Sequence, residues 1–139
     1  MSFQEKAAWV DAATTLSACA IYLCVVVPRL SAGSAEQVAY EWPLIAAVVA
    51  AIVATIVGQI VISACNPREA DQSDERDAVI NRSGGYVSSF VLGAGCLGAL
   101  SLTMLKFDHF WIANALFTSF MLAELTSSGV KLFRYRVGC

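Results

Sequence analysis

The chain has 139 residues and a mass of 14.8 kDa, which is enough for one domain. Its apolar fraction is 58% and its charged fraction is 14%, whereas soluble globular domains carry roughly 45–50% apolar and about 25% charged residues. The net charge of −2 and the pI of about 5.2 exclude the global basic field that nucleic-acid binding needs. The composition therefore predicts an integral membrane protein.

Four apolar segments are long enough to cross a hydrocarbon core of about 30 Å as helices, at about 1.5 Å per residue. They cover approximately residues 7–27, 42–65, 83–105 and 110–130. Since no repeat or further domain is visible, residues 1–139 are expected to form a single membrane domain. We predict an all-α fold, an antiparallel four-helix transmembrane bundle in contact with the lipid bilayer.

The distribution of basic residues predicts the orientation of these spans, because cytoplasmic loops are enriched in Lys and Arg. Two of the nine basic residues, Arg29 and Lys106, fall on one side of the spans. The others fall on the opposite side; they are Lys6, Arg68, Arg76, Arg82, Lys131, Arg134 and Arg136. Both termini and a charged loop over residues 66–82 are therefore predicted to be cytoplasmic (N-in/C-in).

Small residues recur at helical spacing on two of the spans. Ala46, Ala50, Ala54 and Gly58 form one ridge, and Gly95 with Ala99 forms another. Such ridges let helix backbones approach closely in lipid. They predict tight packing within the bundle, and a seam between two copies of the chain is the alternative. The Ser83-Gly84-Gly85 sequence is interpreted as a flexible entry to the third span.

Ionisable residues inside membrane spans are costly and are therefore candidate functional sites. Asp11 and Glu124 both fall roughly 8–10 Å below the cytoplasmic surface at the helical rise per residue. The second and third spans place Gln59, Ser88 and Ser89 near the same depth. We therefore predict a buried polar layer formed by these five residues. One hypothesis is a proton- or ion-responsive site, and the other is a structural hydrogen-bond network with the acids paired to Lys6 or Lys131.

Charged residues also gather at the predicted cytoplasmic face. This predicted charged face consists of Glu5, Lys6, Asp74, Glu75, Arg76, Asp77 and Arg136. Ion pairs of Glu5 or Asp77 with Arg136 are expected there. The segment around Asp74 fits a short capped helix at the membrane surface. This helix is either simply solvated or a docking surface for a partner.

Catalytic and metal-binding motifs do not occur in the sequence. It has no nucleophile elbow, no H-E-x-x-H and no phosphate loop. The five cysteines include no C-x-x-C, and His109 is the single histidine. We therefore predict neither a metal site, nor a cofactor, nor an enzymatic activity.

Four short motifs occur along the chain, namely Glu5-Lys6-x-x-Trp9, Asp74-Glu75-Arg76-Asp77-x-x-Ile80, Leu122-Ala123-Glu124 and Tyr135-Arg136-x-Gly138. Together they resemble an uncharacterised family of small bacterial four-span inner-membrane proteins. The family tail is similar to Tyr-Arg-Arg-Gly, and Val137 stands here in place of the second arginine. The resemblance implies a multi-pass protein of the bacterial plasma membrane and implies no activity.

Two functional hypotheses follow. The first is a small regulatory or accessory protein whose charged cytoplasmic face binds a cytosolic or membrane protein partner or anionic lipid. The alternative is a small oligomeric transporter or channel with a polar pathway through Asp11, Gln59 and Glu124.

Overall fold

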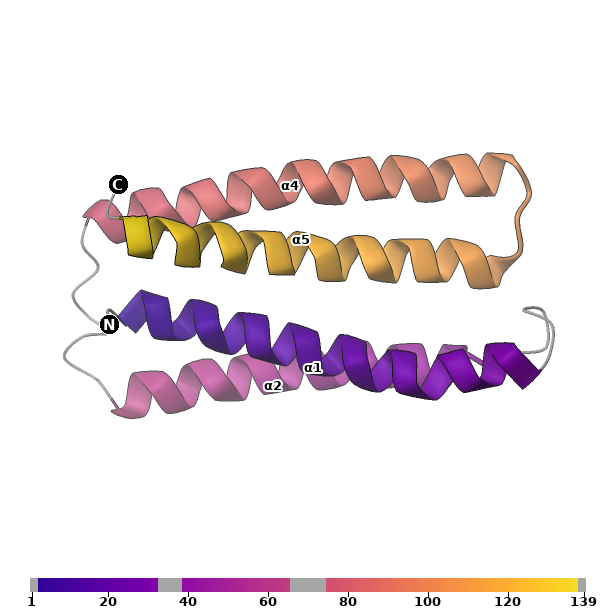
Figure 1. Cartoon of the computed structure of the whole chain (residues 1–139), viewed down its shortest axis with the longest axis horizontal. Helices are drawn as coiled ribbons and strands as arrows, with labels where there is room; N and C mark the ends of the chain where they lie inside the picture. The colour runs from indigo at the N-terminus through magenta and orange to yellow at the C-terminus, as the bar shows by residue number, and fades with distance from the viewer. Residues whose placement is uncertain (1–2, 33–38, 66–74, 138–139) are drawn as a thin grey trace.

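The computed structural model describes residues 3–32, 39–65 and 75–137, and nearly all of these residues are helical. The described residues form four helices, α1 (Phe3–Ala32), α2 (Glu41–Cys65), α4 (Glu75–Met104) and α5 (His109–Val137). The described part of the chain contains no strand. The prediction of an all-α protein is thus confirmed. Figure 1 shows both ends of the chain at the same end of the molecule.

Three of the described helices are long and apolar enough to cross a membrane, namely α1, α2 and α4. The fourth helix, α5, has 29 residues but includes Asn114, Glu124 and several serines and threonines. Three of these hydroxyl residues, Ser119, Ser127 and Ser128, are buried against other helices. The central place of α5 accommodates these three serines, because they face protein instead of lipid.

The helices pack in the order α2, α1, α5, α4. Extensive contacts join α4 to α5, α1 to α2 and α1 to α5. Figure 1 shows the resulting arrangement, with α4 and α5 on one side and α1 and α2 on the other. The outer helices α2 and α4 expose most of their apolar side chains, as helices that face lipid do.

An aromatic cluster joins α1 to α5. Tyr22 of α1 is 2% exposed, and its ring centroid lies 4.5 Å from that of Phe117. The Tyr22 hydroxyl donates a 2.6 Å hydrogen bond to Oδ1 of Asn114. Val26, Ala47, Phe110 and Met121 complete this core. The cluster places α5 against α1 and so determines where the two helix pairs meet.

The seam between α4 and α5 is formed by small residues, as the ridge on the third span predicts. Gly95 faces Ser119 so closely that a Cβ atom there would overlap the serine side chain. Ala99 is buried in the same seam. The close approach of two backbones explains why α4 and α5 share the longest interface.

The interpretation of Ser83-Gly84-Gly85 as a flexible entry is wrong, because α4 runs without interruption from Glu75 to Met104. Gly84 is buried, and a Cβ there would lie 2.9 Å from Cγ of Lys131 and 3.0 Å from the carbonyl oxygen of Ser127. Because Gly84 has no side chain, α5 can approach α4 closely at this position. Glu75 and Asp77 lie in the first turn of α4, where negative charge stabilises a helix. Residues 75–82, predicted as part of a loop, therefore extend the helix.

The ridge of small residues on α2 packs differently from the ridge on α4. Gly58 lies against α1, and a Cβ atom there would be 2.5 Å from Cγ1 of Val10. Ala46, Ala50 and Ala54 are exposed. Only the end of the predicted ridge therefore packs within the chain.

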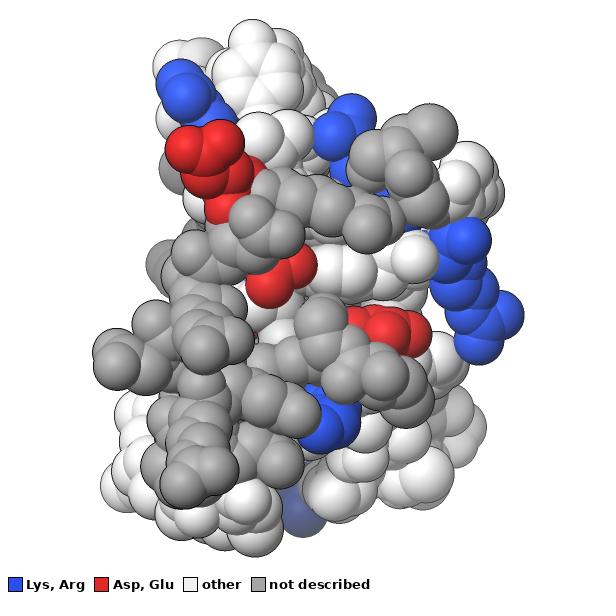
Figure 2. All heavy atoms as spheres, turned by 90° about the vertical axis from the view of Figure 1, so that its left-hand side faces the viewer, with Lys and Arg blue, Asp and Glu red and all other residues white. Residues whose placement is uncertain are grey.

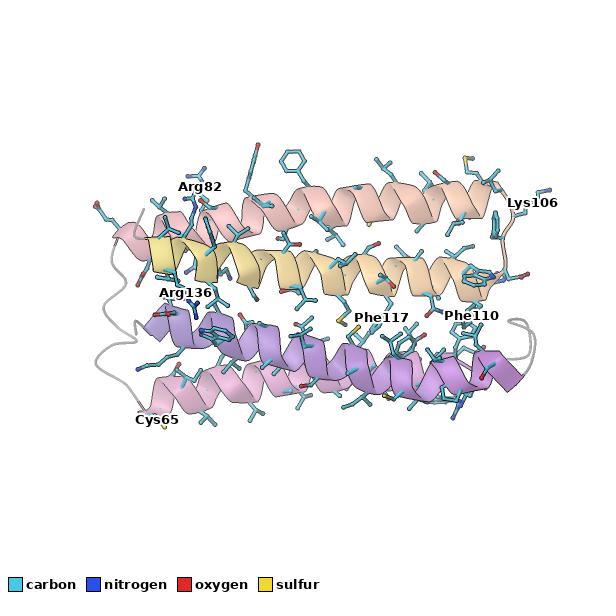
Figure 3. The ribbon with its side chains drawn as sticks, viewed as in Figure 1. Cys65, Arg82, Lys106, Phe110, Phe117 and Arg136 are labelled. Carbon is cyan, nitrogen blue, oxygen red and sulfur yellow. The ribbon has the colours of Figure 1, made fainter. Side chains whose placement is uncertain are left out.

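The turn between α4 and α5 lies at the end of the molecule opposite the two chain ends (Figure 3). Lys106 adopts a positive φ of 57°. Its amide bonds to the carbonyl of Thr103, and the amide of Phe107 bonds to that of Leu102. This pairing is the Schellman motif, in which a left-handed residue ends a helix.

Candidate functional site

A groove of about 740 Å³ lies between α1, α2 and α5. It forms because α2 and α5 each pack extensively on α1 but not on one another, so that α1 provides its floor. The lining residues include Asp11, Thr15, Thr55, Gln59 and Glu124. The others are Leu44, Val48, Ala51, Ile52, Ile56, Ala113, Leu116, Phe117, Phe120 and Met121.

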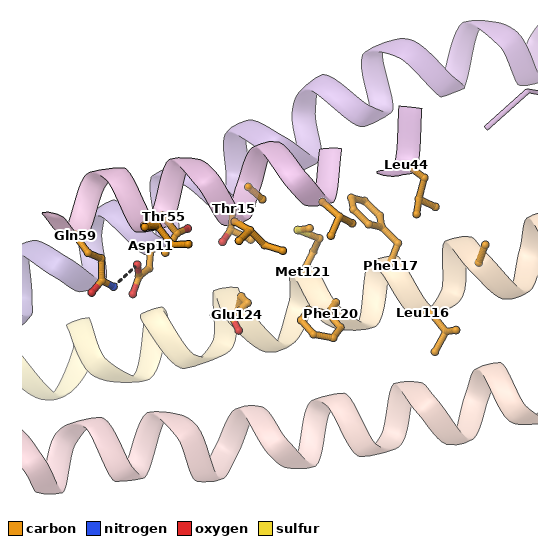
Figure 4. Close-up of a pocket in the computed structure, with 15 residues that line it drawn as sticks. Asp11, Thr15, Leu44, Thr55, Gln59, Leu116, Phe117, Phe120, Met121 and Glu124 are labelled. Atoms are coloured by element: carbon orange, nitrogen blue, oxygen red, sulfur yellow. Dashed lines mark hydrogen bonds between the residues drawn. The ribbon is translucent and has the colours of Figure 1, made fainter. Parts of the chain in front are cut away.

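The polar residues gather at one end of this groove (Figure 4). There Nε2 of Gln59 donates a 3.1 Å hydrogen bond to Oδ1 of Asp11. Beside it, the hydroxyl oxygens of Thr14 and Thr55 lie 3.1 Å apart and share a hydrogen bond. These contacts bind α1 to α2, and they hold the Asp11 carboxylate at the wall of the groove.

Glu124 approaches the same end of the groove from α5. Its side chain is exposed, and no described residue forms a hydrogen bond or ion pair with its carboxylate. The next basic residue along α5 is Lys131, seven residues further on, which is about 10 Å along the helix axis. Lys131 also lies against Gly84 of α4. The Glu124 carboxylate is therefore available to a ligand.

The other end of the groove is apolar. Leu44 of α2 and Phe117 of α5 lie near each other there (Figure 4), and Val48 and Leu116 also line the groove. Along α2 the lining extends from Leu44 to Gln59, a distance of roughly 22 Å at the helical rise. The groove is thus elongated and mostly apolar, with two carboxylates at one end.

The structure brings together three of the five residues of the predicted polar layer. Asp11, Gln59 and Glu124 line the groove, but the layer is not enclosed, since Gln59 and Glu124 are exposed and Asp11 is half-buried. Ser88 and Ser89 lie elsewhere, on α4. Their hydroxyl groups donate hydrogen bonds to the carbonyl of Gly85 in the same helix, at 3.0 and 2.8 Å.

The predicted charged face lies at the end of the molecule that carries both chain ends. Figure 2 shows acidic and basic side chains together on this end, and Arg82 and Arg136 are labelled there in Figure 3. Asp77 accepts a 2.9 Å hydrogen bond from the Tyr135 hydroxyl, next to the predicted partner Arg136. Asp74 and the side chain of Arg76 lie outside the described residues.

One further contact closes this end. The Asn81 amide donates to Oε1 of Gln4 at 3.2 Å, which ties α4 to α1. Ile80 is 1% exposed beneath the charged residues. Ile80, Ala7 and Ala8 fill the interior at this end. The charged side chains of the predicted charged face therefore lie around this apolar interior, at the surface.

Sequence reasoning missed the apolar walls of the groove. Phe117, Phe120 and Met121 have the residue types of any lipid-facing or core position, so no sequence signal separates them. Thr15 and Thr55, by contrast, stand one helical turn from Asp11 and Gln59, and this spacing marks them as neighbours. Within the described residues, no group of three or more His, Cys, Asp or Glu side chains has an arrangement that holds a metal ion.

No family model, no curated protein and no solved structure matches the chain.

Proposed function

We propose that the protein is a small transporter of the bacterial plasma membrane, with the groove between α1, α2 and α5 as its substrate site. The observation that carries the proposal is the convergence of Asp11, Gln59 and Glu124 from three helices at one end of a 740 Å³ groove. Uncompensated carboxylates at membrane depth are costly and are typical of substrate and ion pathways. A purely structural polar network has no need of Glu124, whose carboxylate bonds to no residue that the structure describes.

In this proposal the four helices form an antiparallel transmembrane bundle, with α5 as the fourth span and both termini cytoplasmic. The asymmetry of Lys and Arg supports that orientation. The exposed apolar face of α2, together with its Ala46, Ala50 and Ala54 ridge, supports an oligomer, because four helices alone leave much of the pathway open to lipid. The protein is not an enzyme in this proposal.

Proteoliposomes provide the test. Uptake of ethidium, carboxyfluorescein and glucose is compared between the native protein, Glu124→Gln, Asp11→Asn and Asp108→Asn. Asp108 is an exposed acid in the turn before α5 and serves as the matched control. Facilitated uptake of one solute that is lost in the first two variants and kept in the third supports the proposal. Absence of uptake of all three solutes contradicts it.

The second candidate is an accessory protein that binds a protein partner through the predicted charged face. It is favoured by a separate hollow of about 430 Å³ at the end of α5, lined by Gly129, Val130, Phe133, Arg134 and Val137. Phe133 is 67% exposed there, and an exposed aromatic beside an arginine is common at protein interfaces.

Crosslinking in native membranes tests this second function. A partner that is lost on Phe133→Ser or on charge reversal at Glu75 and Asp77 supports it. Recovery of the protein only with itself, unaffected by these substitutions, contradicts it.

A further inference from the structure

The charge in the groove has one sign. Two of its lining residues, Asp11 and Glu124, are acidic and none is basic. Among the described residues, Gln59 donates one hydrogen bond to Oδ1 of Asp11, so a single oxygen of the two carboxylates has a donor there. The polar end of the groove is therefore complementary to positive charge, and its remaining carboxylate oxygens are the acceptors that a cationic group takes up.

The length of the groove limits the shape of the ligand. The apolar lining continues from the carboxylates along α2 to Leu44, roughly 22 Å away, which exceeds the thickness of one leaflet, about 15 Å. Phe117 and Phe120 present aromatic rings between the two ends, and such rings attract organic cations as well as apolar surface. A small hydrated metal ion would leave most of this lining without a partner.

The carboxylates also exclude ligands that carry an anionic group next to the cation. An aminophospholipid places a phosphodiester close to its ammonium, and that phosphodiester would be repelled by Glu124 and Asp11. It also holds its headgroup at the membrane surface, whereas both acids lie roughly 8–10 Å below that surface in the proposed orientation.

We infer that the groove between α1, α2 and α5 binds a lipophilic organic cation that has no anionic group. The positive centre lies between Asp11 and Glu124, and the apolar body lies along Phe117, Phe120 and Leu44. The inference rests on the proposed function, in that it names the substrate class of the same groove.

The test compares two ions of the same shape and opposite charge, tetraphenylphosphonium and tetraphenylborate. Binding of each radiolabelled ion to the full-length protein in nanodiscs is measured by equilibrium dialysis, with empty nanodiscs subtracted. We expect saturable binding of tetraphenylphosphonium at least about tenfold tighter than that of tetraphenylborate, because a single charge contact contributes about that factor. Glu124→Gln should weaken phosphonium binding by about tenfold, and Asp108→Asn should not change it.

Phe120→Trp keeps an aromatic wall and should retain phosphonium binding, while Phe120→Ser removes that wall without adding charge and should weaken phosphonium binding. Equal binding of the two ions, or phosphonium binding that Glu124→Gln leaves intact, would overturn the inference. If a disulfide forms between two copies of the Phe120→Cys variant at a rate that neither ion lowers, the inference would also be overturned, because a second copy would then fill the groove. Phosphonium binding without ethidium, carboxyfluorescein or glucose uptake refutes transport alone, whereas uptake of carboxyfluorescein without phosphonium binding refutes the substrate class alone.

Discussion

The hydroxyl of Tyr22 and the side-chain amide of Asn114 are joined by a 2.6 Å hydrogen bond, although the residues are 92 positions apart in the chain. The bond crosses the seam between α1 and α5, which joins the two helix pairs. Tyr22 is 2% exposed, so its hydroxyl has no access to water. The Asn114 amide in turn donates to the carbonyl of Phe110 at 2.8 Å, which holds the acceptor oxygen toward α1.

Removal of this bond should loosen the seam. Tyr22→Phe is expected to lower the free energy of unfolding by about 1 kcal/mol, because hydrogen bonds between membrane helices contribute about 0.6 kcal/mol on average and up to about 1.7. Thermal unfolding in dodecyl maltoside, in a double-mutant cycle with Asn114→Ala, measures the coupling. Tyr86→Phe, at an exposed position, is the control. Additive effects of the two substitutions would show that the bond does not contribute to stability.

The close approach at Gly95 should make that position intolerant of any side chain. Gly95→Ala is expected to destabilise the protein by roughly 1–3 kcal/mol, because its Cβ overlaps Ser119 and forces α4 away from α5. Gly98→Ala is the matched control, since a Cβ there meets nothing within 4 Å, and its stability should be kept or slightly raised. Ser119→Gly should restore stability to Gly95→Ala. Equal stability of the two single variants would refute the assigned seam.

The left-handed conformation of Lys106 should be a source of strain. Lys106→Gly is expected to raise the free energy of unfolding by about 1 kcal/mol, because glycine adopts a positive φ without steric cost. Lys106→Val should lower it, since a β-branched residue is least tolerated there. Lys106→Asn removes the same charge and also tolerates the conformation, so it separates strain from charge. Identical unfolding temperatures for the glycine and valine variants would contradict this expectation.

The proposed orientation predicts which cysteines a membrane-impermeant maleimide reaches in intact cells. Cys65 ends α2 on the side that carries both chain ends (Figure 3), whereas Lys106 lies on the opposite side. In a background that lacks the other cysteines, Lys106→Cys should react in intact cells and Cys65 only after permeabilisation. The reverse pattern would invert the topology.

Some of the site was predictable from sequence because helical rise fixes depth. Counting residues from Lys6 and Lys131 placed Asp11 and Glu124 at one level, and Gln59 followed in the same way. Depth does not specify the direction in which a side chain points around its helix. Ser88 and Ser89 have the right depth, but neither lines the groove. Ser88 stands one turn from Gly84 on the face of α4 that contacts α5, Ser89 is exposed, and both hydroxyls donate to the carbonyl of Gly85 within α4.

The glycine pair at 84–85 shows a second limit. Glycine is a poor helix former in isolation, and that local preference suggested an irregular entry to the third span. In the structure Gly84 is selected by contact, since Lys131 and Ser127 occupy the space of a Cβ atom. The competing effect is tertiary packing, which no pattern within the segment itself reveals. The ridge on α2 is the converse case, because its spacing is regular but three of its alanines are exposed.

The order α2, α1, α5, α4 has a consequence for assembly. Each hairpin, α1 with α2 and α4 with α5, contains its own long interface, and the seam of α1 with α5 joins them. Two gene fragments, one ending after Cys65 and one starting at Glu75, should therefore each insert as a stable hairpin and reassociate in the membrane when expressed together. Exchange of the α4–α5 hairpin would then change only the α5 side of the groove, and exchange of the α1–α2 hairpin would change its other two sides.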